Sequence, residues 1–181
     1  MGNPGGLLHS APRWAIAAVA VLAALSCQPQ AGDRMTQDQA LAIGSRWLEA
    51  RNTYDLDLLD DIYAPGVVVH DCSLPEAIQG LGALKSFYEA SHSGFPDLRM
   101  SIDDVFVSGD HVIFRGALEA THLGSLRGIP PTGKRVVLPW VAIDRIEDGK
   151  IAEESVYYDE LVLLKQLGLF PPSPTASPQG G

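Results

Sequence analysis

Positive charge is scarce in this sequence. Its 181 residues include 13 Lys and Arg against 22 Asp and Glu, which gives a formal net charge of −9. Proteins that bind nucleic acid neutralise its phosphates with a basic surface, and here only Arg127, Lys134 and Arg135 gather in one stretch. We therefore expect no nucleic-acid partner.

Cysteine is nearly absent, and so is any spacing typical of metal ligands. The two cysteines, Cys27 and Cys72, are too few for a disulfide framework or a cysteine-based metal site. No H-x-x-x-H motif occurs, and the adjacent His70 and Asp71 of a predicted strand would point to opposite faces. No metal site is expected. A Cys27–Cys72 disulfide could form in an oxidising compartment, but we favour a small buried side chain at Cys72.

No hydrophobic run is long enough for a comfortable membrane span. The longest, from Trp14 to Leu25, follows a single cation, Arg13, and this order is typical of a signal peptide, which we place at 1–26. The run ends in ALSC, which resembles a bacterial lipobox and would make Cys27 the lipidated first residue of the mature protein. That lipid would anchor the exported protein to a membrane of the bacterial cell envelope, periplasmic or outer. In the alternative, an ordinary secretory signal, Cys27 is not acylated and the protein is secreted.

Both ends of the remaining chain lack core-forming residues. Residues 27–35 are typical of a polar tether, and the Pro- and Ser-rich residues 171–181 of a disordered tail. One domain over 36–170 remains, without an internal repeat.

Within this domain, the pattern predicts helices first and strands afterwards. Thr36 to Gln39 has the form of a capping box and precedes apolar residues at helical spacing. Closely spaced strand patterns follow, and a last helix begins after Asp159. The strand patterns cover 97–108, 111–123, 134–146 and 150–159. We therefore expect an α+β fold whose consecutive antiparallel strands form a curved sheet with helices on one face.

One loop resembles a nucleotide-binding motif without its chemistry. Residues 128–135, GIPPTGKR, match all but the last letter of the phosphate-binding loop G-x-x-x-x-G-K-[ST]. Arg135 replaces the hydroxyl that would hold magnesium, and Pro130 and Pro131 remove two N–H donors. A strand pattern follows where the motif needs a helix. We expect a hairpin connection here.

Polar residues on apolar strand faces are the first candidates for chemistry. His122 shares the parity of the apolar residues of 111–122, and Asp144 shares that of its strand, together with Trp140. Asp159 precedes the last helix, and His70 follows three valines. Structural explanations stay open for each: His122 could cap a turn, Asp159 could be a helix N-cap, and His70 could lie at a rim.

Several segments, in order along the chain, resemble one family. They are VVVHDC (67–72), FPDLR (95–99), GDHVIFRGALEATHLG (109–124), GIPPTGKRV (128–136), RIEDGKIAEE (145–154) and DELVLLKQLG (159–168). Together they are similar to the SnoaL-like, or ester cyclase, proteins, polyketide cyclases of the nuclear transport factor two-like (NTF2-like) superfamily. The resemblance implies a conical α+β barrel, with a strongly bent antiparallel sheet packed on N-terminal helices around an apolar pocket.

The resemblance also implies a mechanism. Ring closure in these cyclases is an intramolecular aldol condensation without metal or organic cofactor, and it needs a base and an acid in an apolar cavity. Asp159 matches the family's acid/base residue, with His122 and His70 as assisting groups. The residues that would bind substrate are Trp47, Tyr63, Arg115, Trp140 and Tyr157. Arg115 has the parity opposite to His122, so a strand bulge would be needed to bring both inward. A homodimer is a further expectation.

Two functions follow. In the favoured one, the exported protein is a cofactor-independent cyclase, isomerase or hydrolase that acts on a small, largely apolar carbonyl compound. In the alternative, it is a non-catalytic envelope lipoprotein that uses the same cone to bind a small molecule or a protein partner.

Overall fold

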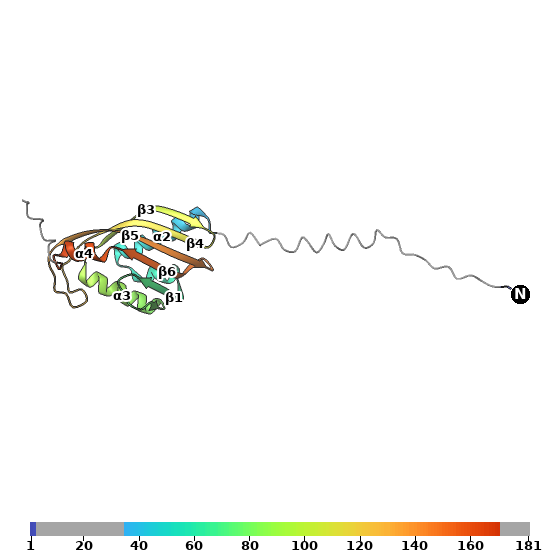
Figure 1. Cartoon of the computed structure of the whole chain (residues 1–181), viewed down its shortest axis with the longest axis horizontal. Coiled ribbons are helices and arrows are strands. Elements are labelled where there is room, and N and C mark those ends of the chain that lie inside the picture. The colour runs from blue at the N-terminus through green and yellow to red at the C-terminus, as the bar shows by residue number, and fades with distance from the viewer. Residues whose placement is uncertain (3–34, 171–181) are drawn as a thin grey trace, which may run out of the picture. The chain divides into compact units, whose positions relative to one another are not determined.

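The computed structural model of the chain describes residues 1–2 and 35–170 (Figure 1). The rest of the expected signal peptide, Cys27 and the tail at 171–181 lie outside the described residues, so lipidation and export stay predictions. Among the helices of the described part, none combines the length and the apolar character needed to cross a membrane.

Helices come first in the domain and most strands later, as the sequence predicts. The elements are α2 (Gln37–Thr53), η1 (Leu56–Asp61), β1 (Tyr63–Asp71), β2 (Ile78–Gln79), α3 (Leu81–Gly94), β3 (Arg99–Ser108), β4 (His111–Thr121), β5 (Arg135–Glu147), β6 (Lys150–Tyr158) and α4 (Glu160–Leu167). The loop at 128–135 joins β4 to β5 and precedes no helix, which confirms a hairpin connection.

Helix α2 begins at the predicted capping box. The Thr36 side chain accepts a hydrogen bond from the Gln39 backbone N–H, and the Gln39 side chain bonds back to the Thr36 backbone. The buried positions further along the helix include Trp47, Ala50 and Arg51, which the helical repeat places on one face. This face brings an arginine into the interior together with a tryptophan.

Six strands form one curved sheet in the order β2-β1-β6-β5-β4-β3. Consecutive strands β3 to β6 pair antiparallel, as predicted. β1 pairs with β6 in parallel, so the sheet is mixed and not wholly antiparallel as we expected. Only strands joined by a tight hairpin must run antiparallel, and β1 is separated from β6 by most of the domain. Helix α2 packs along β3, α3 along β1, and α4 along β5.

The sheet bends where β3 meets β4. The register of this pair shifts between Ile102 and Asp104, and Gly116 pairs with Ile102 at that point. A Cβ atom at Gly116 would stand 1.8 Å from the carbonyl oxygen of Ser101, so only glycine permits this approach. The ring of Trp140, opposite on β5, covers the same glycine. The bend therefore shapes the inner face that carries the tryptophan.

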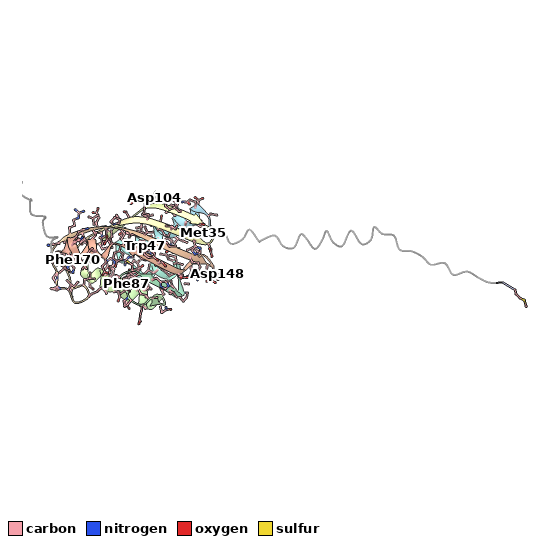
Figure 2. All side chains as sticks on the ribbon, in the orientation of Figure 1. Met35, Trp47, Phe87, Asp104, Asp148 and Phe170 are labelled. Carbon is pink, nitrogen blue, oxygen red and sulfur yellow. The ribbon has the colours of Figure 1, made fainter. Side chains whose placement is uncertain are left out.

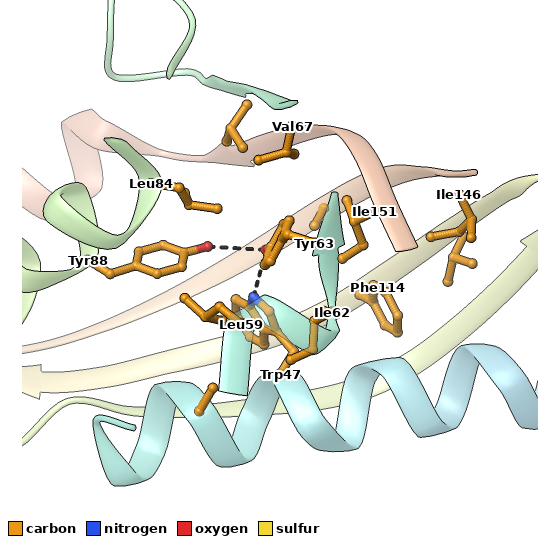
Figure 3. Close-up of a cluster of buried hydrophobic side chains, with 14 of the residues drawn as sticks. Trp47, Leu59, Ile62, Tyr63, Val67, Leu84, Tyr88, Phe114, Ile146 and Ile151 are labelled. Atoms are coloured by element: carbon orange, nitrogen blue, oxygen red, sulfur yellow. Dashed lines mark hydrogen bonds between the residues drawn. The ribbon is translucent and has the colours of Figure 1, made fainter. Parts of the chain in front are cut away.

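Tyr63, at the start of β1, lies at the centre of the core and is fully buried. Figure 3 shows its hydroxyl between the indole N–H of Trp47 and the hydroxyl of Tyr88, with a hydrogen bond to each. Apolar side chains surround it on the remaining sides, among them Leu59, Ile62, Val67, Leu84 and Ile151. A polar group is thus held inside the hydrophobic core, and it reaches from there toward the site described next.

Candidate active site

A cavity of about 390 Å³ opens between the inner face of the sheet and the helices. Its walls are mainly apolar and include Val69, Phe87, Met100, Leu118, Leu138 and Leu163. Leu163, Leu164 and Leu167 of α4 lie on one side, near the Phe170 end of the domain in Figure 2, while the turn at Asp148 lies at the opposite end. The volume suits a ligand of small-molecule size.

Two kinds of charged side chain line this cavity. Arg127 and Glu160 form an ion pair with 3.3 Å between Nη1 and Oε1, and both are partly open to solvent. Arg51 and Glu154 are 4% and 2% exposed and lie in the interior. We therefore place the mouth of the cavity at the Arg127–Glu160 pair and its chemically unusual part at Arg51 and Glu154.

A β-bulge in β6 turns Glu154 inward. Arg145 pairs with Glu153, but Ile146 pairs with Ile151, so Ala152 is an extra residue on β6. Strict alternation from the buried Ile151 would send Glu154 to the outer face. Because the bulge reverses the parity, Glu154 is buried, and Val156 and Tyr158 follow it on the cavity side.

Glu154 is held by a short chain of hydrogen bonds. The Tyr63 hydroxyl donates to Glu154 Oε2 at 2.8 Å and accepts from Trp47 Nε1 at 2.9 Å. A hydroxyl has only one proton to donate, so Tyr88, whose oxygen lies 3.3 Å from that of Tyr63, is the donor in that contact. Three aromatic side chains thus support one carboxylate oxygen.

Asp144 of β5 pairs directly with Glu154 across the two strands. It is 2% exposed, and its Oδ1 has no hydrogen-bond partner among the described residues. Both carboxyl groups, together with Trp140, border a second void of about 10 Å³. Two acids of neighbouring strands therefore lie side by side in surroundings that exclude water.

The pKa values of both acids are raised. Burial raises the pKa of Glu154 to about 7, although the Tyr63 hydrogen bond and the charge of Arg51 act in the opposite direction. Burial, and next the charge of Glu154, hold the pKa of Asp144 well above its usual range. The charge of Glu154 thus opposes the ionisation of Asp144, and Glu154 itself, with a pKa of about 7, exchanges its proton at neutral pH with little cost in free energy.

Arg51 comes from the last turn of α2, where the helix dipole favours a cation. Its guanidinium carbon lies 3.6 Å from the centre of the Tyr88 ring and 5.9 Å from that of Trp47. Burial lowers the pKa of Arg51, against the attraction of Tyr88, Tyr63 and Glu154. A desolvated cation–π contact recovers about 2 kcal/mol or somewhat more, which is less than the several kcal/mol that the burial of a charge costs.

Two of the expected substrate-binding residues line the cavity, and one supports it. Trp47 and Trp140 form part of its wall, and Figure 2 places Trp47 inside the domain. Tyr63 lies behind this wall, where it contacts Glu154. The role of these three residues in substrate binding stays a prediction, and the sequence analysis did not single out the acid that Tyr63 contacts.

Four other predicted residues point away from the cavity. Asp159 is exposed and caps α4, since its Oδ1 accepts from the Val162 N–H at 3.0 Å. Tyr157 is 54% exposed. Arg115 forms an ion pair with Asp104 on the outer face, so no bulge turns it inward. His70 is exposed beside Glu153, as expected for a rim residue. For Tyr157, the reason is the reversed parity of β6, whereas Asp159 lies beyond the end of that strand, where it caps α4.

His122 is buried, as its parity predicts, but it does not line the cavity. Its Nδ1 accepts a hydrogen bond from the Thr132 backbone N–H at 3.3 Å, and its backbone pairs with Lys134. The ring packs against Phe95, which separates it from the cavity. His122 and Asp159 therefore do not lie in the same cavity. The hydrogen bonds of His122 instead stabilise the loop between β4 and β5.

Cys72, which we expected to be buried, is exposed and unpaired within the described part of the chain. It follows the inward-facing Asp71, so alternation along the chain sends it outward. No group of three or more His, Cys, Asp and Glu suited to a metal ion occurs within residues 1–2 and 35–170.

Comparisons with known proteins agree with this architecture. The chain is 31% identical over 147 residues to aklanonic acid methyl ester cyclase DauD of Streptomyces sp. strain C5, which covers 75% of the chain and 83% of that protein. TsrD of Streptomyces laurentii superposes with a TM-score of 0.68 at 26% identity, over 75% of this chain and 99% of TsrD.

A protein from Jannaschia sp. CCS1, described as a SnoaL-like polyketide cyclase, has the same fold. Its TM-score is 0.69 at 23% identity, over 80% of this chain and 99% of that one. The model of the SnoaL-like polyketide cyclases matches residues 42–167. The chain belongs to the SnoaL-like polyketide cyclase family, with its NTF2-like α+β fold.

Proposed function

We propose that the protein is a cofactor-independent acid/base enzyme, a cyclase or isomerase that acts on a small, largely apolar carbonyl compound. One observation carries the proposal: an acid with a pKa of about 7, Glu154, lies on the wall of an apolar cavity of about 390 Å³. A general base is most efficient when its pKa lies near the working pH. The name of the relative DauD, a methyl ester cyclase, supports the same class of reaction.

The mechanism follows from one carboxyl group that both takes and returns a proton. Ionised Glu154 removes a proton from the carbon next to a carbonyl group, and the hydrogen bond from Tyr63 positions it. The resulting enolate carbon attacks a second carbonyl of the same molecule, which forms a carbon–carbon bond and an alkoxide. Protonated Glu154 then gives its proton to the alkoxide oxygen. In an isomerisation, it returns the proton to another carbon.

Asp144 is the second buried acid beside Glu154, and its burial and then the charge of Glu154 raise its pKa. It lies beside Glu154 but borders only the smaller void, not the cavity. Because its pKa is raised well above the usual range, it remains protonated when Glu154 ionises. The two buried acids therefore carry one negative charge between them when Glu154 ionises, and not two, which keeps Glu154 usable as a base.

Exchange of hydrogen for deuterium tests the first step without knowledge of the natural substrate. The purified protein is incubated with 2-tetralone or 1-indanone in D₂O, and loss of the signal of the protons next to the carbonyl is followed by ¹H NMR. We expect exchange faster than in a protein-free blank, and a loss of about 100-fold or more in Glu154→Gln, which is the usual contribution of a general base.

Asp159→Asn is the matched comparison, because asparagine keeps the cap of α4. The geometry predicts that its exchange rate stays within about threefold of the wild type, since Asp159 lies outside the cavity. If Asp159→Asn abolishes exchange and Glu154→Gln does not, the sequence-based assignment is right and ours is wrong. Ketones that bind but never exchange would favour the non-catalytic binding protein.

Stability should depend on pH through Glu154. Its pKa in the folded protein, about 7, is above its usual 4.5, so the stability that it contributes is complete below pH 4.5 and is lost as the pH rises through 7. The loss is on the order of 3 kcal/mol. Urea unfolding at pH 5 and pH 8 should show this decrease in the wild type and a smaller one in Glu154→Gln. Equal decreases in both proteins would contradict the assigned ionisation.

We also propose that the protein is exported and anchored through a lipid on Cys27, on the strength of the ALSC sequence and the apolar run before it. Cells fed an isotopically labelled fatty acid should incorporate the label into the wild type and not into Cys27→Ser. Label in both proteins, or in neither, would contradict the proposal that Cys27 carries a lipid anchor.

A further inference from the structure

Arg51 carries a buried charge that the domain itself does not neutralise. Its side chain is 4% exposed, and its Nε and Nη1 atoms have no hydrogen-bond partner among the described residues. It also takes part in no ion pair there, whereas five other arginines do. Arginine is rarely buried unless it is paired. The fold thus holds a costly charge without a partner of its own.

The neighbours of Arg51 hold its side chain in place without accepting hydrogen bonds from its Nε and Nη1 atoms. The ring of Tyr88 lies against the plane of the guanidinium group at 3.6 Å and leaves its N–H edge free. Glu154, the acid that attracts it, accepts its hydrogen bond from the Tyr63 hydroxyl and not from Arg51. The ring of His92 stacks on Tyr54 and is neutral at pH 7, because burial lowers its pKa to about 4.

The other charged groups of the cavity wall have partners within the protein. Arg127 pairs with Glu160, and Asp71 accepts hydrogen bonds from Ser73 and Tyr158. Among the described residues that line the cavity, Arg51 is therefore the cation with free donors. An anionic group of a ligand would find its complement there, in surroundings that strengthen a charged hydrogen bond.

We propose that the ligand of this cavity carries a carboxylate, and that Arg51 binds it while the apolar body of the ligand fills the remaining volume. The inference deepens the proposed function and rests on the same cavity. The carboxylate at Arg51 would fix the orientation of the ligand and present its carbonyl group to Glu154. A guanidinium group binds a carboxylate through two parallel hydrogen bonds, which lysine cannot reproduce.

Two probes of equal shape and different charge test this inference. 2-Naphthoate carries a carboxylate and 2-naphthamide a neutral amide, and both are small enough for the cavity. Isothermal titration calorimetry at pH 7.5 should show that the wild type binds 2-naphthoate at least tenfold more tightly than 2-naphthamide. In Arg51→Met this preference should fall to within twofold. Arg127→Met, at the mouth, is the matched control and should keep the preference.

Thermal unfolding separates binding from a structural role. If Arg51 serves a ligand, Arg51→Met should unfold at the same or a higher temperature than the wild type, because it removes an uncompensated buried charge. Should this variant fail to fold, Arg51→Lys replaces it as the test. Lysine keeps the positive charge but lacks the planar guanidinium group that forms two parallel hydrogen bonds with a carboxylate. We expect at least a threefold smaller preference for 2-naphthoate in Arg51→Lys, and an unchanged preference would overturn the inference.

The inference is also overturned if the wild type binds both probes equally, if it binds neither, or if Arg51→Met keeps the preference. None of these results changes the result expected from the hydrogen–deuterium exchange experiment on Glu154. Conversely, Glu154→Gln should keep the preference for 2-naphthoate. If that variant also keeps its exchange activity, the carboxylate site stands and the proposed catalysis does not.

Discussion

The burial of one ionisable carboxyl group on the wall of an apolar cavity is the constraint on which this molecule depends. Glu154 has its unusual pKa first because burial excludes water from it and then because the charge of Asp71 also disfavours its ionised form. The Tyr63 hydroxyl prevents the opposite extreme, an acid that never ionises, by donating to Oε2. Desolvation, which raises the pKa of Glu154, and this hydrogen bond, which lowers it, together leave that pKa near 7.

The burial of these charged groups lowers the stability of the fold. Glu154, Asp144 and Arg51 are all buried, and the structure satisfies only part of their polar atoms. Such groups cost free energy that the surrounding hydrophobic core must offset. Buried charged groups on or directly behind the wall of one cavity, in a domain that is otherwise packed with apolar residues, are typical of a functional site. Membership of the SnoaL-like family agrees with this conclusion and does not by itself supply it.

The sequence predicts the fold well and the site in part. Alternation on β5 correctly places Asp144 on the buried face, and the spacing from Trp47 to Arg51 could have revealed the buried arginine. Glu154 could not be found in this way, because the extra residue Ala152 reverses the parity of β6 and leaves no signature in the alternation itself. Asp159, to which the resemblance assigns the acid/base role, lies beyond the last residue of β6 and caps α4. Local patterns give the faces of strands, while bulges depend on how neighbouring strands pair.

The ionisation of Glu154 is the most direct test of this account. The side-chain carboxyl carbons of a ¹³C-glutamate-labelled protein can be titrated by NMR, and the signal of Glu154 identified from its absence in Glu154→Gln. We predict a midpoint near pH 7, in agreement with the raised pKa. A midpoint at the ordinary glutamate value of about 4.3 would show that Glu154 is hydrated and unperturbed, which would contradict the central claim.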